Sequence, residues 1–313
     1  MSYSRGLQEV GDGLYAYLQP DGGWGWSNAG LIVDGEQTLL IDTLFDLRLT
    51  EQMLREMRRA VPSAARIDTL VNTHANGDHC YGNQLVGDAV IVASERATQE
   101  MSELPPATMA ALVEQAPQLG ELGEFFLRCF GAFEFDGIEL TLPQRTFDGE
   151  LTLHVGSREL RLIEVGPAHT RGDTLVHVPA ERALFTGDIL FSGAHPIAWA
   201  GPVSNWIAAC ERIVALDPAV IVPGHGAPAE LAQVAELKAY FEYLYEQARV
   251  HHDAGETPLQ AARAMRMDRW ADWRESERLV VNIANIYGEL DGADEPLNAL
   301  AAFQQMAELA ATR

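Results

Sequence analysis

The chain has little positive charge. Its 313 residues include 22 lysines and arginines against 45 aspartates and glutamates, which gives a formal net charge of −23 at pH 7. Lys238 is the only lysine. A protein that binds nucleic acid needs a basic stripe that neutralises phosphates. We therefore expect no nucleic-acid partner, and the charge also argues against a nuclease.

Cysteines and long apolar runs are scarce as well. The three cysteines, Cys80, Cys129 and Cys210, are odd in number and form no C-x-x-C pair, so we expect reduced thiols, as in the cytosol. No apolar run is long enough to span a bilayer, and residues 1–10 lack the apolar core of a signal peptide. We expect a cytoplasmic protein with no membrane partner.

The hydrophobic pattern predicts an α/β protein. Alternating or short apolar runs predict strands at 13–18, 29–33, 38–41, 67–71, 89–92, 151–155, 159–165, 174–178, 183–185 and 219–222. Helical spacing predicts helices at 46–60, 207–216, 231–250, 257–265, 275–289 and 296–310. We predict a catalytic domain at 1–227, with a helical insertion at about 94–133, and a helical C-terminal extension at 228–313.

The first candidate metal-binding residues lie in a short turn after the strand at 67–71. Within six residues this turn contains His74, Asn76, Asp78 and His79, next to Gly77. Imidazole and carboxylate groups this close together suit a borderline metal such as zinc. A polar surface turn with two chance histidines is the plainer alternative.

The same arrangement recurs three times further along the chain. A short apolar strand and a glycine, proline or small residue precede His169, Asp188 and His225 in turn. If these strands lie side by side, their ends converge on one rim. We therefore expect one metal site, built from His74, Asp78, His79, His169, Asp188 and His225.

Together these motifs resemble the metallo-β-lactamase fold superfamily, whose pattern is H-x-H-x-D-H…H…D…H. The resemblance runs from about residue 13 to 226 and implies an αβ/βα four-layer sandwich with metals at one edge. It also implies roles for single residues: His74 and His169 in metal site one, Asp78, His79 and His225 in site two, Asp188 as the bridge, and Asp42 as the family's early buried aspartate.

One position departs from the family pattern, because Asn76 stands where a second histidine is usual. A neutral amide oxygen is a poorer zinc ligand than imidazole. Site one is then weak, or Asn76 binds the metal through its oxygen beside a water, or the site is degenerate and non-catalytic. We expect zinc, as one or two ions, with iron or manganese as alternatives.

The resemblance implies a metal-dependent hydrolase. A hydroxide held by metal near Asp188 would attack a thioester, ester or lactone carbonyl, and Asp78 would orient this water and receive a proton. Asp78 and Asp188 are therefore the expected catalytic residues. The alternatives are an iron-dependent, sulfur dioxygenase-like oxidoreductase and a metal-binding module without catalysis.

Four aromatic or imidazole side chains are candidates for substrate contact. Trp24 and Trp26 lie in a glycine-rich loop, which is either a flap over a pocket or a hydrophobic plug. His195 and Trp199 lie on a loop after Asp188, where His195 is expected to line the pocket rather than bind metal. An acidic protein with a tryptophan-rich rim favours a neutral apolar or aromatic substrate, either a small molecule or a carrier-bound chain.

The wider pattern suggests a narrower function. Asn76, the loop at 195–202 and the helical C-terminus resemble lactamase-fold polyketide cyclase/thioesterases, which implies antibiotic biosynthesis on aromatic chains. A lactonase or esterase would be a near relative. In the C-terminal extension, apolar residues between Trp270 and Tyr287 form a stripe that predicts a lid or a homodimer contact, with packing on the chain's own sandwich as the alternative.

Overall fold

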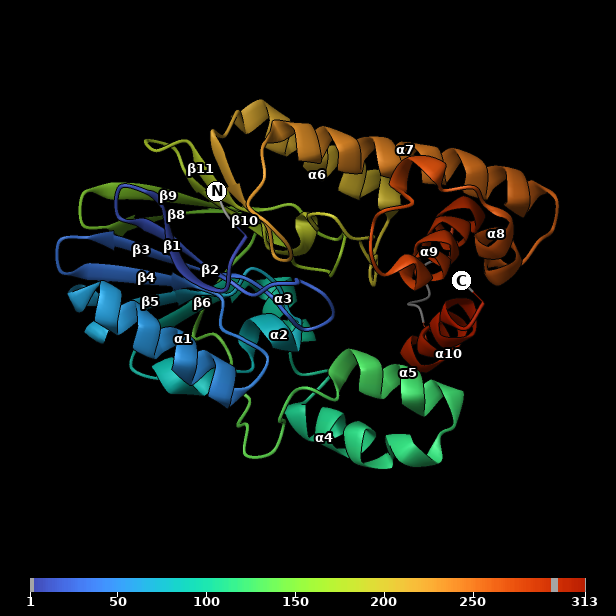
Figure 1. Cartoon of the computed structure of the whole chain (residues 1–313). Coiled ribbons are helices and arrows are strands. Elements are labelled where there is room, and N and C mark those ends of the chain that lie inside the picture. The colour runs from blue at the N-terminus through green and yellow to red at the C-terminus, as the bar shows by residue number, and fades with distance from the viewer. Residues whose placement is uncertain (1–2, 294–297, 313) are drawn as a thin grey trace.

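Two β-sheets form the centre of the molecule in the computed structural model, which describes residues 3–293 and 298–312 (Figure 1). The first sheet contains, in spatial order, β1 (Gly6–Gly11), β2 (Leu14–Leu18), β3 (Ala29–Asp34), β4 (Gln37–Ile41), β5 (Thr69–Val71), β6 (Val90–Ser94) and β7 (Arg145–Phe147). The second contains β12 (Val220–Val222), β11 (Ala183–Phe185), β10 (Thr174–Val178), β9 (Arg158–Glu164) and β8 (Glu150–Val155). Both sheets are mixed, with antiparallel pairs and with parallel pairs such as β4–β5 and β11–β12.

Helices cover the outer faces of both sheets. The α-helices are α1 (Leu47–Ala60), α2 (Gly77–Cys80), α3 (Glu95–Glu100), α4 (Pro106–Gln115), α5 (Glu121–Phe130), α6 (Val203–Leu216), α7 (Leu231–Asp253), α8 (Pro258–Ala264), α9 (Leu279–Asp291) and α10 (Ala299–Ala310). Short 3₁₀ turns are η1 (Pro62–Ala65), η2 (Asn83–Val86), η3 (Ala116–Gln118), η4 (Gly187–Ile189), η5 (Asp268–Trp270) and η6 (Ser276–Arg278). Helix α1 lies on the first sheet, and α6 and α7 lie on the second (Figure 1). The four-layer αβ/βα sandwich is thereby confirmed.

Strand periodicity explains the layer between the sheets. In β9, Leu160 and Leu162 are fully buried while Arg161 between them is exposed. They join Leu14, Ile32 and other apolar residues of both sheets in one buried cluster. Successive side chains on a strand point to opposite faces, so each sheet contributes one apolar face to this core.

Most predicted elements are present, with shifted ends. Residues 34–37 form a hairpin turn between β3 and β4. The strand patterns did not reveal β1 or β7, which are an edge strand and a three-residue strand. The predicted helix at 296–310 corresponds to α10, and residues 296–297 lie outside the described residues.

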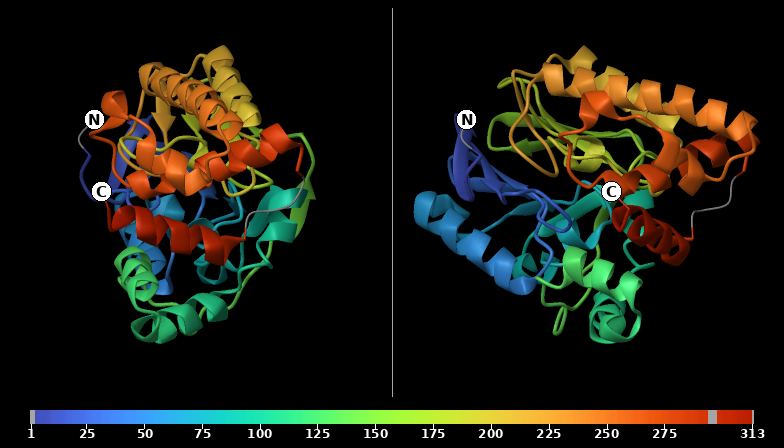
Figure 2. Two further views of the ribbon diagram at one scale, coloured as in Figure 1. Left: turned by 90° about the vertical axis from the view of Figure 1, so that its right-hand side faces the viewer. Right: turned by 45° about the vertical axis from the view of Figure 1, so that its right-hand side comes forward.

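Two helical segments far apart in sequence meet at one end of the sandwich. Helices α4 and α5 come from the insertion, and α9 and α10 come from the C-terminus (Figures 1 and 2). Helix α10 contacts both α5 and α9. Within the described ranges, no helix has the length and apolarity needed to cross a membrane.

The C-terminal apolar stripe is covered inside the chain. Val280, Ile283 and Ile286 are fully buried, and their helix α9 packs against α7 and α8. The stripe is therefore a packing surface of this chain rather than a surface free for a second copy. A homodimer remains a prediction that does not follow from this stripe.

Candidate metal centre and cavity

The predicted ligand residues converge at one edge of the sandwich. His74 follows β5, Asp78 and His79 lie in α2, His169 follows β9, Asp188 lies in η4 after β11, and His225 follows β12. They form two sets whose ligand atoms lie within 4.8 Å of one another. We call His74, His169 and Asp188 the first ligand group, and Asp78, His79 and His225 the second ligand group.

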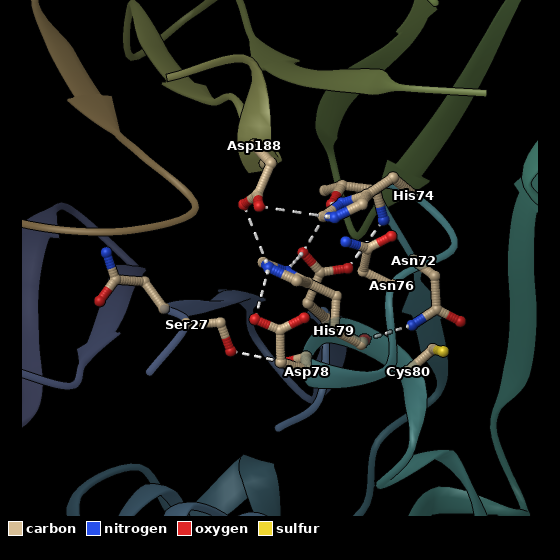
Figure 3. A network of polar contacts seen from close by, with 12 residues as sticks. Ser27, Asn72, His74, Asn76, Asp78, His79, Cys80 and Asp188 are labelled. Carbon is tan, nitrogen blue, oxygen red and sulfur yellow. Dashed lines mark hydrogen bonds and ion pairs between the residues drawn. The ribbon is translucent and has the colours of Figure 1, made fainter. Parts of the chain in front are cut away.

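Asp188 lies between the two groups (Figure 3). Its Oδ1 is 3.1 Å from Nε2 of His79, and its Oδ2 is 3.3 Å from Nε2 of His169. The same Oδ2 is 3.4 Å from Nε2 of His225. One buried carboxylate thus faces imidazoles of both groups.

The hydrogen bonds of the first group fix which imidazole nitrogen faces inward. Thr73 donates its hydroxyl hydrogen to Asp42 at 2.7 Å, so its oxygen must accept from Nδ1 of His74 at 3.0 Å. Nδ1 of His169 donates to the carbonyl oxygen of Ile197 at 2.7 Å. Both histidines therefore direct an unprotonated Nε2 toward Asp188.

In the second group, too, hydrogen bonds from Nδ1 fix the orientation of each imidazole. Nδ1 of His79 donates to Asp42 Oδ2 at 2.9 Å, and Nδ1 of His225 donates to the carbonyl oxygen of Gly22 at 3.2 Å. Such outer partners orient a ligating imidazole and set its tautomer. All four histidines thus present Nε2 to a common centre.

Two glycines are required by close approaches at this centre. A Cβ on Gly224 would lie 1.9 Å from Oδ1 of Asp188. Gly187 has a φ of +50°, and a Cβ there would lie 2.5 Å from the hydroxyl oxygen of Thr73. The glycines in the sequence motifs therefore leave room for the bridging carboxylate and its neighbours.

Electrostatics differ between the groups. Burial, with the neighbouring charge of His79, holds the pKa of His74 well below its usual value, and burial also lowers the pKa of His169. In the second group, burial also disfavours the charged form of the imidazoles, but the negative charge of nearby carboxylates outweighs this effect of burial. Asp188 and Asp78 raise the pKa of His225 to about 9 and that of His79 well above its usual value.

The donor set fits a metal ion. Among the described residues, Nε2 of His74 is buried without a hydrogen-bond partner, and the buried Nε2 of His79 and Oδ1 of Asp188 face each other. Such atoms are rare in protein interiors and call for an unseen ligand. Donors about 2.0–2.2 Å from a tetrahedral ion lie about 3.3–3.6 Å from one another. The contacts of Asp188 and the 3.2 Å between Asp78 Oδ2 and His225 Nε2 are close to that spacing.

Asn76 sits beside the first ligand group. Its Nδ2 lies 3.1 Å from Nε2 of His169, the nitrogen that faces Asp188. The amide is therefore placed at the first group, as the sequence motif suggests, and it occupies the space of an additional donor there. Its oxygen can reach a metal only if the amide is turned, since the nitrogen now faces His169.

A cavity of about 1050 Å³ opens over this centre, and its lining includes Asn76, Asp78, His169, Asp188 and His225. Most of its other lining is apolar, and α4, α5, α9 and α10 supply a substantial part of it. Small-molecule sites are concave and mostly apolar, with a few polar groups. The metal centre is thus one wall of a large apolar cavity.

The predicted substrate residues divide into two pairs. Trp24 and Trp199 line the cavity, as a flap and a loop over the pocket would. Trp26 instead packs on Phe133, with ring centroids 4.9 Å apart, and is not part of the lining. Trp24 therefore covers the cavity as a flap would, whereas Trp26 of the same loop packs inside the fold as a plug would.

His195 does not line the cavity, which corrects its predicted position. It is 1% exposed, its Nδ1 lies 3.1 Å from the hydroxyl of Tyr240, and its ring contacts Trp273. Helix α7 and the segment before α9 enclose this loop, so His195 is a packed histidine.

Sequence reasoning missed Arg278, a cavity residue that is 1% exposed. Its guanidinium carbon lies 4.0 Å from the ring centre of Trp24, and it pairs with Glu275 at 2.9 Å. Arg278 and Trp24 are 254 positions apart in the sequence, and no local motif connects them.

Comparison with known proteins decides the family. The model of the metallo-beta-lactamase superfamily matches residues 22–225, which include every residue of both ligand groups. The chain belongs to this superfamily. The match ends before α7, so the C-terminal helices that line the cavity lie outside it.

Among relatives, the human protein named acyl-coenzyme A thioesterase MBLAC2 is 28% identical over 214 residues, which cover 64% of this chain and 72% of the human one. The metallo-beta-lactamase from Pontibacter korlensis has a TM-score of 0.58 at 17% identity and covers 75% of this chain and 98% of that one. The stereoselective inverting sec-alkylsulfatase Pisa1 from Pseudomonas sp. has a TM-score of 0.68 at 17% identity and covers 94% of this chain and 52% of that one. This chain thus matches about half of the sulfatase's length, and the two structures share the fold.

Proposed function

We propose that the protein is a metal-dependent hydrolase that cleaves a thioester of an apolar acid. One observation carries the proposal: four imidazoles direct Nε2 to a common centre that forms the wall of a large apolar cavity. Membership of a superfamily with hydrolases among its members and the likeness to an acyl-coenzyme A thioesterase support it. Related esters, lactones and aromatic polyketide thioesters belong to the same chemical class.

The residues at the centre divide the chemistry among them. A divalent ion held at this centre would lower the pKa of a bound water and polarise the scissile carbonyl. Asp78 lines the cavity, and although burial opposes its ionisation, His79 and His225 lower the pKa of its carboxyl. Asp78 is thus an ionised carboxylate placed to orient a water and hold a proton. Asn76 also lines the cavity, and its amide can donate a hydrogen bond to the substrate carbonyl.

The test is turnover of aryl and alkyl thioesters by the purified protein, with metal content measured on the same sample. We expect hydrolysis by the wild type and a loss of about 10²–10⁴-fold in kcat for Asp78→Asn. A fully metallated wild type that hydrolyses no thioester, ester or lactone would refute the proposal. Bound iron with oxygen consumption on a persulfide would instead favour the oxidoreductase, and ligand binding without turnover would favour a non-catalytic module.

A further inference from the structure

The cavity extends well beyond the space that a reacting carbonyl needs. Helices α4 and α5 contribute residues such as Met109 and Phe126 to its lining, and α9 and α10 contribute Gly288 and Phe303, whose ring packs on that of Phe126. Its volume of about 1050 Å³ lies at the upper end of the range of about 300–1,000 Å³ for small-molecule sites. Most of the lining outside the ligand groups is apolar.

Apolar side chains continue to the rim of the cavity. Leu104, Leu119 and Leu300 line it, although they are 47%, 43% and 63% exposed. Leucines exposed together at the mouth of a cavity indicate a surface that an apolar ligand covers. Charge in the same region is partly balanced, since Arg171 pairs with both Glu100 and Glu103.

Helix α9 leaves room for a ligand at Gly288. A Cβ on this residue would have no neighbour within 4 Å among the residues that the structure describes, and its φ is not positive. Glycine inside a helix is less stable than alanine because its backbone loses more conformational freedom on folding. Neither the backbone nor the packing therefore requires glycine here, and its missing side chain widens the cavity.

We propose that this cavity binds the long, unbranched acyl chain of the substrate and that Gly288 sets the chain length that fits. The inference rests on the proposed function and specifies its substrate class. A flexible chain can follow the apolar wall from the ligand groups, past Gly288, to the leucines at the rim. Each methylene buried on this path contributes about 0.8 kcal/mol, or about fourfold in kcat/KM.

The first test is a series of straight-chain acyl thioesters of increasing length, assayed with the wild type and with Gly288→Ala and Gly288→Leu. In the wild type, kcat/KM should rise with chain length. Gly288→Leu should lose at least about tenfold on the longest chains, because two or more methylenes no longer fit, and should keep its activity on the shortest. Gly288→Ala should shift the profile less. A wild-type profile that is flat with length, or a folded Gly288→Leu with an unchanged profile, overturns the proposal.

Two leucines on α5 provide a matched pair. Both Leu122 and Leu127 are partly buried, but only Leu122 lines the cavity. Leu122→Ala should move the optimum toward longer chains, whereas Leu127→Ala should leave it in place. Equal effects of the two substitutions would assign the change to general destabilisation. They would contradict the proposal that the cavity binds the acyl chain.

Binding separates this inference from the proposed function. Dissociation constants of straight-chain fatty acids for the isolated protein need no turnover. Affinity that grows with chain length and is reduced by Gly288→Leu supports acyl-chain binding in the cavity, even if no thioester is cleaved. In that case only the hydrolase proposal fails. Tighter binding of a polycyclic aromatic acid than of any straight chain would overturn the inference and favour an aromatic substrate.

Discussion

Both ligand groups have imidazoles that face Asp188, a member of the first group, but their other donors differ. The first group offers two imidazoles, and its remaining neighbour is the amide of Asn76. The second group offers two imidazoles and the carboxylate of Asp78, so with Asp188 it has the four protein donors of a complete tetrahedral site. We predict that the second group binds metal more tightly.

Charge reinforces this difference. The imidazoles of the first group have lowered pKa values because they are buried. The imidazoles of the second group are also buried, but the carboxylates around them reverse the direction of the pKa shift. The same carboxylates attract a metal cation, and the site releases protons when the cation binds.

The largest expected effect comes from the residue that joins the two groups. Asp188→Asn removes the negative charge that faces His79, His169 and His225. We expect both groups to lose metal affinity by more than about a hundredfold, because loss of a direct donor should exceed the 10–100-fold effect of an outer partner. Titration with zinc under competition by a chelator measures it. Wild-type affinity in this variant would contradict the bridging position of Asp188.

A smaller effect should separate the groups. Asp42 accepts directly from Nδ1 of His79, whereas it reaches His74 only through Thr73. Asp42→Asn should therefore weaken metal binding about 10–100-fold at the second group and less at the first. The same titration resolves two binding steps. An equal loss in both steps would mean that Asp42 supports the whole centre rather than His79.

Asp173 is a buried carboxyl next to the first group, as Asp42 is next to the second. It accepts hydrogen bonds from the backbone and hydroxyl of Thr170, next to His169, and burial raises the pKa of its carboxyl from 3.8 to about 8. The folded protein therefore retains a proton that the unfolded chain releases, and stability falls as pH rises from about 4 to about 8.

Asp173→Asn should remove this loss, because the amide stays neutral at every pH and its oxygen can still accept from Thr170. We expect the free energy of unfolding, measured in urea across this range, to fall less with pH in the variant than in the wild type. Glu103→Gln is the matched control, since this carboxylate is 62% exposed and should leave the slope unchanged. Parallel slopes for Asp173→Asn and wild type would show that Asp173 is ionised in the folded protein.

Local patterns predicted the sandwich and the ligand residues because strand ends, glycines and histidines lie close together in the sequence. Glycine before Asp188 and before His225, for example, reflects contacts shorter than a Cβ allows. The cavity could not be predicted in this way. Its walls pair α5 with α10 across the sequence, and Arg278 meets Trp24 only in the fold. His195 was misplaced because a loop near the rim offers no signal of which side faces inward.

Metal content of the wild type and of Asn76→His tests the central claim most directly. Both proteins are loaded with zinc, dialysed and analysed for bound metal and for folding. The account predicts one tightly held ion per chain in the wild type, at the second ligand group, and two in Asn76→His, where a new imidazole completes the first. Two equally tight ions in the wild type, or an unchanged count in a folded Asn76→His, would contradict it.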